Sequence, residues 1–348
     1  MHLTCYFGPN VDLYFVGRVL AGLYEQPGVR VKLRLADWIT NNSSLGVEFG
    51  GRRLAIELSD HADYWDNALL DWSDVYSKRS LLSDYPHARS KIIPFGLHCA
   101  GHSKRSMAAV FLALAPVLPS SFQKRWKEYY RYMVTPHWRD FEYAPDAPVT
   151  DTILYQTRVW EHAEAPGDVI VNEERVSLLR ELRRTFKHRF AGGLVPTPYA
   201  KEHYPDLIAS QTTRQPQYIQ WAKRSAIGIY SRGLFGSHAF KMAEFLASSK
   251  CVVSDPIYNL LPAPLQHIPT FRDNAECLTL CDTLLSQPKM LSEHRHLSWQ
   301  YYQDYVQPKA IIARLLKHLA EPTSPPAKPF SFNLSQDQPV PQGGTIDC

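Results

Sequence analysis

Strand-like and helix-like segments alternate along most of the chain, and this alternation restricts the possible fold more than any other feature. Residues 2–7, 29–36 and 54–61 have the apolar or period-two pattern of strands, whereas residues 11–26 have the apolar spacing of a helix. A further strand is expected within residues 90–98. Such alternation is typical of a parallel sheet that helices cover on both faces. We therefore predict an α/β fold for the first part of the chain.

A second alternating series follows a stretch at residues 101–145 that is basic, aromatic and, at its end, rich in proline. The predicted units are an N-terminal α/β domain at 1–146 and a second α/β domain at 147–305, followed by a last helix at 306–320 and a disordered tail at 321–348. Pro308 is expected to split the last long helical stretch. The second series consists of strands at 151–160, 188–195, 226–233 and 251–255, and of helices at 172–186, 217–225, 237–247 and 274–287.

Composition narrows the class of protein. The 348 residues suit about two domains, and 45% hydrophobic and 21% charged residues are ordinary for a globular protein. A formal charge of +4 fits a phosphate-bearing ligand or an anionic surface, but it is too weak to indicate nucleic-acid binding. The six cysteines form no CxxC pair, so buried reduced thiols and a cytoplasmic location are expected. No secretory signal is predicted, because the N-terminal stretch has no basic region followed by an apolar one. No membrane span is predicted, because the longest apolar run, at 107–119, is too short.

Ligands of open parallel sheets bind beyond the carboxyl ends of the strands. One loop at such an end stands out, because residues 231–236 contain two glycines and lead into a predicted helix with Ser237 as its N-cap. A helix start of this kind favours an anion. His238, Lys241 and Glu244 follow at intervals of three, and a diphosphate needs a cation while a ribose needs a carboxylate. A solvated helix face with a chance charge pair is the alternative interpretation.

The stretch "GLFGSHAFKMAEFLASSKCVVSDPIYNLLP" resembles the donor-binding segment of GT-B glycosyltransferases of the group 1 and exostosin-like kind. The resemblance implies two Rossmann-like domains that face a cleft, with a C-terminal helix that crosses back to the N-terminal domain. It implies that Glu244 contacts the donor ribose and that Lys241 and the loop 231–236, with Ser231, Gly233 and Gly236, lie at the donor phosphates. Gly236 stands where many retaining members of the family carry a second glutamate.

Arg158 ends the first strand of the second domain, where its guanidinium could clamp a diphosphate. Stacking on Trp160 or pairing with Glu161 is the alternative. The sequence has no D-x-D pair, so we expect no metal and no other cofactor, and Arg158, Lys241 and helix N–H groups would stabilise the leaving diphosphate.

The acceptor side is predicted at the carboxyl ends of the first domain's strands. Asp60 and His61 end one strand, and either could act as the base of an inverting transfer, although a loop cap is the simpler interpretation. Lys78, Arg79 and His98 are predicted to line the same cleft.

Residues 120–133 combine basic and aromatic side chains, a composition that suits a membrane interface, a lipid-linked acceptor or an ordinary interdomain helix. The sequence as a whole predicts a metal-independent glycosyltransferase, of the kind that serves polysaccharide biosynthesis. It would move a sugar from a nucleotide diphosphate sugar to a glycan or lipid-linked acceptor. The alternative is a non-catalytic protein on the same scaffold that binds sugar nucleotides or glycans.

Overall fold

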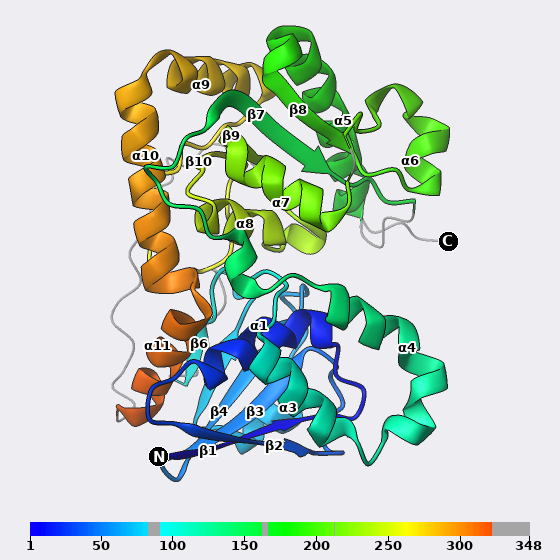
Figure 1. Cartoon of the computed structure of the whole chain (residues 1–348), viewed down its shortest axis with the longest axis vertical. Helices are drawn as coiled ribbons and strands as arrows, with labels where there is room; N and C mark the ends of the chain where they lie inside the picture. Colours follow the sequence, from blue (N-terminus) through cyan, green and yellow to red (C-terminus); the bar gives the residue numbers. More distant parts are fainter. Residues whose placement is uncertain (83–90, 162–165, 212, 322–348) are drawn as a thin grey trace, which may run out of the picture.

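The computed structural model describes residues 1–82, 91–161, 166–211 and 213–321. The described part forms two α/β units, one above the other in Figure 1, and each unit has its own sheet. The predicted fold class is confirmed. The limits that we set between the domains remain a prediction, and the predicted tail lies outside the described residues apart from Glu321.

The first sheet has the strand order β2-β1-β3-β4-β5-β6. Five strands run parallel, but β3 is antiparallel to both of its neighbours, so the purely parallel sheet expected from the sequence is wrong for this unit. The cause is a two-residue hairpin, in which Gly50 and Gly51 have φ of +60° and +79°. The strands are β1 (His2–Phe7), β2 (Arg30–Leu35), β3 (Ser44–Phe49), β4 (Arg52–Glu57), β5 (Val75–Lys78) and β6 (Ile92–Pro94).

The two faces of the first sheet are covered unequally. Along β4, Leu54 and Ile56 enter the main core of the unit, whereas Ala55 faces a smaller cluster on the other side. Helices α1, α3, α4 and α11 contribute to the main core, and α2 covers the opposite side. These helices are α1 (Leu13–Tyr24), α2 (Asn67–Trp72), α3 (Lys104–Leu114), α4 (Leu118–Val134) and α11 (Pro308–Ala320), with a short 3-10 turn, η1 (Trp138–Phe141), before the second unit.

The second sheet is fully parallel, with the strand order β10-β9-β7-β8. Strands β8, β9 and β10 are buried along nearly their whole length, which agrees with their continuous apolar sequences. The elements are β7 (Thr150–Thr157), α5 (Pro166–Phe186), β8 (Phe190–Leu194), α6 (Pro198–His203), α7 (Gln215–Arg224), β9 (Ser225–Tyr230), α8 (Phe240–Ala247), β10 (Cys251–Ser254), α9 (Asn274–Ser286) and α10 (Pro288–Tyr301).

The chain returns to the first unit at its end, as predicted. A π-helical turn at Tyr302–Val306 follows α10, and Pro308 then starts α11 as a separate helix. Ile311, Ile312 and Leu315 of α11 are buried in the core of the first sheet (Figure 1). The last helix therefore fastens the second unit to the first.

We predict that Gly22→Ala lowers the free energy of unfolding by about 1–3 kcal/mol, because an added methyl overpacks the contact between α1 and α11. A Cβ on Gly22 would lie 2.4 Å from the Pro308 carbonyl oxygen and 2.8 Å from Ile312 Cγ1. Urea unfolding followed by circular dichroism measures the change. Ala313→Ser, on the exposed face of α11, is the control and should shift stability by less than about 0.5 kcal/mol. Equal stability of both variants would contradict the packing of α11 described above.

Candidate functional site

The carboxyl ends of the second sheet's strands carry a set of charged residues. Arg158 follows β7 and is exposed, and Arg232 follows β9. Arg232 bridges Glu174 on α5 and Asp255 after β10, with nitrogen–oxygen distances of 2.7 and 3.1 Å. The charged groups after three neighbouring strands thus lie on one edge of the sheet, as parallel strands require.

A buried arginine that the sequence analysis missed fixes the loops at this edge. Arg175 of α5 donates one hydrogen bond to the Arg158 carbonyl, at 2.7 Å, and another to the Arg232 carbonyl. Its guanidinium carbon also lies 4.4 Å from the centre of the Trp160 ring, so Arg175 makes the stacking contact that the sequence analysis considered for Arg158. Because Arg175 holds two loop carbonyls, the backbone that carries Arg158 and Arg232 is held in place.

Lys241 and Glu244 form a partly buried ion pair on α8. Lys241 Nζ lies 3.3 Å from Glu244 Oε2 and 3.2 Å from the centre of the Tyr218 ring, and the side chains are 30% and 9% exposed. Burial lowers the pKa of Lys241, Glu244 opposes that shift, and the nearby Arg158 cation adds to it. The charge of Arg158 thus acts on Lys241, which is paired with the Glu244 carboxylate.

The loop before α8 differs from the prediction. The helix begins at Phe240 with Ala239 as its N-cap, so Ser237 is not the cap. Residues 234–236 form a 3-10 turn that ends at Gly236, where φ is +66°. The Gly233 N–H donates to the Ser237 carbonyl and the Ser237 N–H donates to the Leu234 carbonyl, so these two N–H groups bond within the loop.

His238 lies ahead of α8 and is almost completely buried, so it does not share the helix face of Lys241 and Glu244. Burial and the nearby Arg79 cation lower the pKa of His238 to about 3. The expectation that this histidine touches a donor at the helix face is not met in this structure. Ser231, by contrast, lies at the sheet edge, where its Oγ accepts a hydrogen bond of 3.0 Å from Tyr155.

The first unit faces this edge through α1 and the strand-to-helix loops. The Phe240 ring packs against Tyr14 and Phe15 of α1, with centroid distances of 5.7 and 5.5 Å. The guanidinium carbon of Arg131, on α4, lies 3.5 Å from the centre of the Tyr14 ring. Burial raises the pKa of Tyr14, and the nearby Glu244 carboxylate raises it further. The aromatic ring and the cation thus border the junction opposite Lys241 and Glu244.

Arg79 connects the two units directly. It follows β5, is 1% exposed, and donates to the Asp60 carboxylate and to the His238 carbonyl across the junction. The guanidinium carbon also lies 5.1 Å from the centre of the Phe240 ring. Arg79 therefore engages the predicted base Asp60 and the loop before α8 at the same time.

Lys78 and His98 are buried beneath the site and contact the loops that form it. Lys78 is 0% exposed and bonds Glu57 at 2.6 Å and the carbonyls of His61 and Tyr64 at 3.1 and 2.7 Å. His98 is 1% exposed, and its Nε2 lies 2.6 Å from the Phe15 carbonyl oxygen. Neither side chain lines a cleft in this structure, because both are enclosed by the first unit and its junction with the second.

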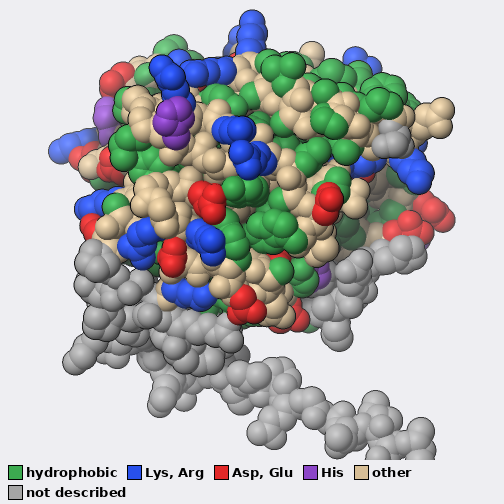
Figure 2. All heavy atoms as spheres, turned by 90° about the horizontal axis from the view of Figure 1, so that it is seen from below, with side chains coloured by type: hydrophobic (Ala, Val, Ile, Leu, Met, Phe, Trp, Pro, Cys, Tyr) green, Lys and Arg blue, Asp and Glu red, His purple; other side chains and the backbone are tan. Residues whose placement is uncertain are grey.

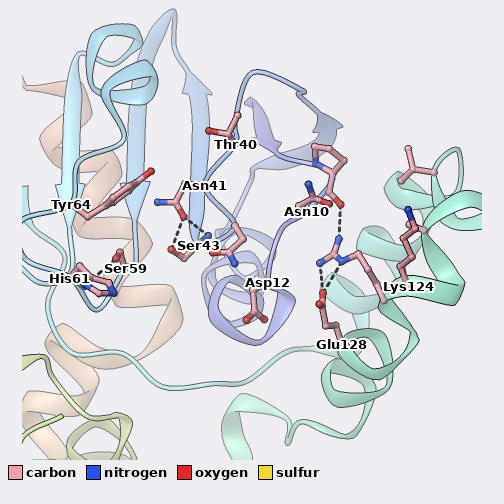
Figure 3. Close-up of a pocket in the computed structure, with 15 residues that line it drawn as sticks. Asn10, Asp12, Thr40, Asn41, Ser43, Ser59, His61, Tyr64, Lys124 and Glu128 are labelled. Carbon is pink, nitrogen blue, oxygen red and sulfur yellow. Dashed lines mark hydrogen bonds and ion pairs between the residues drawn. The ribbon is translucent and has the colours of Figure 1, made fainter. Parts of the chain in front are cut away.

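A polar cavity of about 970 Å³ opens at the carboxyl edge of the first sheet. Figure 3 shows residues from four parts of the chain around it, and His61 is the only predicted site residue among them. The α4 residues belong to the segment 120–133 that the sequence analysis singled out, but sequence reasoning missed the loop residues, since asparagine and serine in loops look like ordinary turn residues. They come from the loop after β1 (Pro9, Asn10, Asp12), the loop before β3 (Thr40, Asn41, Asn42, Ser43), the loop after β4 (Ser59, His61, Tyr64) and α4 with the residue before it (Val117, Ser121, Lys124, Arg125, Glu128).

Within the described ranges, no group of three or more His, Cys, Asp or Glu side chains is arranged to hold a metal ion. The cysteines described, at 5, 99, 251, 277 and 281, are all free and buried, as predicted. Burial raises the pKa of Cys5 and of Cys251 to about 12, so neither thiol is a nucleophile at neutral pH.

Comparison with known proteins gives likenesses of structure alone. No family model and no curated protein matches the sequence. The C-terminal domain of a glycosyl transferase group 1 family protein (LpcC) from Francisella tularensis is 10% identical, with 47% of this chain and 95% of that chain covered and a TM-score of 0.35.

Two further solved structures cover most of the chain. A UDP-GlcNAc 2-epimerase from Neisseria meningitidis, bound to UDP-GlcNAc, is 10% identical over 91% of this chain and 100% of its own, with a TM-score of 0.44. MnaA from S. aureus, in a structure with UDP, is 8% identical over 90% and 94%, with a TM-score of 0.42. The fold is evident from the chain's own architecture, which consists of two facing α/β units and a last helix that crosses back to the first unit. The chain has a GT-B-like fold.

We predict that a fall in pH lowers the free energy of unfolding of this GT-B-like chain, because the histidine His238 is buried beside Arg79. The pKa of His238 is 6.5 in the unfolded chain and about 3 in the folded chain. Between these pH values the unfolded chain binds a proton at His238 and the folded chain does not. Stability is thus lost as the pH falls from 6.5 towards 3. Between pH 7 and pH 5, wild type should lose about 2 kcal/mol more than His238→Gln, as urea unfolding at the two pH values would measure. Equal losses would show that His238 takes up its proton while the chain is folded.

Proposed function

We propose that the protein is a glycosyltransferase that takes a sugar from a nucleotide diphosphate sugar and transfers it to a glycan or lipid-linked acceptor. The observation that carries the proposal is the meeting of Arg158 and Lys241 beside Glu244 at the carboxyl edge of a parallel sheet, opposite a second α/β unit. This position is where open parallel sheets bind their ligands. Two converging cations suit a diphosphate, and a carboxylate beside them suits the hydroxyls of a ribose.

The acceptor side of the proposed reaction is the polar cavity of the first unit. Its lining of asparagine, serine, threonine and tyrosine side chains offers donors and acceptors that suit sugar hydroxyls. His61 projects into this cavity, and Asp60 lies next to it in the chain (Figure 3). The cavity and the cation pair thus lie on different units, as a transfer between two substrates requires.

The proposed chemistry follows from these groups. His61 or Asp60 takes the proton of an acceptor hydroxyl, the hydroxyl oxygen forms a bond to the anomeric carbon, and the bond from that carbon to the diphosphate oxygen breaks. The negative charge that develops on the leaving diphosphate is stabilised by Arg158 and Lys241, so we propose that no metal ion is needed. Closure of the units around Arg79 would exclude water and limit hydrolysis of the donor.

We predict that Lys241→Met weakens binding of the preferred nucleoside diphosphate about tenfold or more, because a charge-assisted hydrogen bond contributes about 1.5–3 kcal/mol. Isothermal titration with UDP, GDP and ADP in the presence of EDTA measures the change. Lys201→Met, on the exposed surface of α6, is the control and should bind like wild type.

The role of Glu244 has its own readout in the same titration. Wild type should bind the ribose form of the nucleotide more tightly than the 2′-deoxy form, and Glu244→Gln should reduce that preference. If wild type binds none of the three nucleotides, or if Lys241→Met binds as well as Lys201→Met, the proposed donor site is wrong.

We predict that His61→Ala lowers turnover by about 10²–10⁴-fold and leaves nucleotide affinity unchanged, since a general base acts on the reaction and not on donor binding. Release of nucleoside diphosphate from the sugar nucleotide measures turnover. Asp60→Asn is the companion variant; because it also removes the partner of buried Arg79, its loss of turnover identifies Asp60 as the base only if nucleotide affinity stays unchanged. Full activity of both variants would contradict the proposed acceptor site, whereas tight binding without any turnover in wild type would favour a non-catalytic sugar-nucleotide-binding protein.

A further inference from the structure

Helix α4 presents a row of large apolar side chains to solvent. Phe122, Trp126, Tyr130 and Met133 are 55%, 49%, 57% and 48% exposed. Their spacing of four, four and three residues places them on one face of the helix. Helix α4 lies at the outer side of the first unit (Figure 1), so this aromatic face is directed away from the core. A contiguous exposed apolar row on a folded protein is typical of an interaction surface.

The helix itself is firmly held, so the exposure is not the result of a loose segment. On its inner face Tyr129 and Tyr132 are 1% and 0% exposed and belong to the main core of the first unit. Arg125 is also largely buried and donates to the carbonyls of Pro9 and Val11. The aromatic face is therefore a fixed feature of the folded unit.

A basic side chain, Lys127, lies beside the aromatic face, with its Nζ 5.8 Å from the centre of the Trp126 ring. The other basic residues of α4 are directed elsewhere: Arg125 is largely buried and pairs with Glu128, Lys124 lines the cavity, and Arg131 packs on the Tyr14 ring. Seen from below, the first unit shows hydrophobic, basic and acidic side chains interspersed (Figure 2). The helix as a whole carries four basic residues and one acidic residue. A surface with this charge is complementary to an anionic partner.

We propose that the aromatic face of α4 docks on the surface of an anionic lipid membrane. Tryptophan, tyrosine and phenylalanine partition into the headgroup region of a bilayer, and lysine and arginine beside them are attracted to anionic lipids. No described helix is long and apolar enough to cross a bilayer, so the contact is one of a helix that lies in the interface.

The docking has a consequence for the substrate class, and this step rests on the proposed function. Ser121, Lys124 and Glu128 of α4 line the polar cavity of the first unit (Figure 3). At 100° per residue, these three positions lie on the side of α4 opposite the aromatic face, so docking holds the cavity about one helix diameter away from the lipid headgroups. The acceptor that fits this arrangement is a lipid-linked glycan long enough to reach past the helix, with its terminal sugar in the cavity and its lipid in the bilayer.

Sedimentation with lipid vesicles tests the docking without reference to activity. The full chain is mixed with vesicles of phosphatidylcholine alone or with added phosphatidylglycerol, and the bound fraction is measured at low and high salt. Wild type should bind the anionic vesicles, and Trp126→Ser combined with Phe122→Ser should reduce the partition coefficient about tenfold or more. Lys127→Gln should reduce it about fivefold, and high salt should weaken binding of wild type. Leu297→Ser, which changes an exposed leucine on α10, is the control and should bind like wild type.

Three results would overturn the docking proposal. They are an absence of wild-type binding to anionic vesicles, equal binding to neutral vesicles, and equal binding by the wild type and the double variant. Size-exclusion chromatography identifies a competing occupant, because a dimer that the double variant converts to a monomer would assign the face to a second copy of the chain. Nucleotide titration of the double variant separates the two proposals, since loss of vesicle binding with normal nucleotide affinity supports docking whether or not the enzyme is a transferase.

Discussion

The guanidinium of Arg79 is the contact on which the arrangement of the two units depends. A buried cation is costly unless its donors are satisfied, and Arg79 finds partners on both sides of the junction: Asp60 and the Leu58 carbonyl in its own unit and the His238 carbonyl in the other. Two buried histidines beside it, His98 and His238, have lowered pKa values because of burial and of the Arg79 charge. These surroundings therefore favour the neutral form of both histidines.

A second buried ion pair shapes the acceptor side. Glu57 and Lys78 lie 2.6 Å apart and are both 0% exposed, so burial raises the pKa of Glu57 and lowers the pKa of Lys78. The Lys78 ammonium also binds the carbonyls of His61 and Tyr64, which holds the loop after β4. The side chains that enter the cavity are thus positioned by charges that no ligand touches. Removal of one partner of such a pair leaves an uncompensated buried charge and lowers the free energy of unfolding by about 3–5 kcal/mol, so the loop and the fold depend on the same pair.

The sequence predicted much of the fold because apolar periodicity is a local property. All four strands of the second sheet follow from it, whereas the split before α11 follows from Pro308 itself. The antiparallel β3 was missed, although Gly50–Gly51 between apolar runs is a hairpin signal. Ser237 looked like an N-cap, but the turn at 234–236 and its hydrogen bonds delay the helix to Phe240, a tertiary effect that propensity cannot show.

The sequence could indicate only those candidate site residues that lie just after a strand or near the start of a helix. Arg158, Lys241 and Glu244 could be proposed together because strand ends and helix starts can be located in a sequence. The burial of Lys78, His98 and His238, the role of Arg175 and the asparagine-rich cavity depend on contacts between segments far apart in the chain. Polar residues at such places have the same sequence signature as surface turns, so only the three-dimensional arrangement separates them.

Hydrogen–deuterium exchange with and without a nucleoside diphosphate tests the central claim most directly, because it locates the ligand without a choice of variant. If a donor binds between the two units, exchange should slow at residues 156–160 and 231–244 of the second unit and at residues 12–15 of the first. Slower exchange on both sides of the junction would support the account. Protection confined to a different surface, or no change at a ligand concentration that saturates binding, would contradict it.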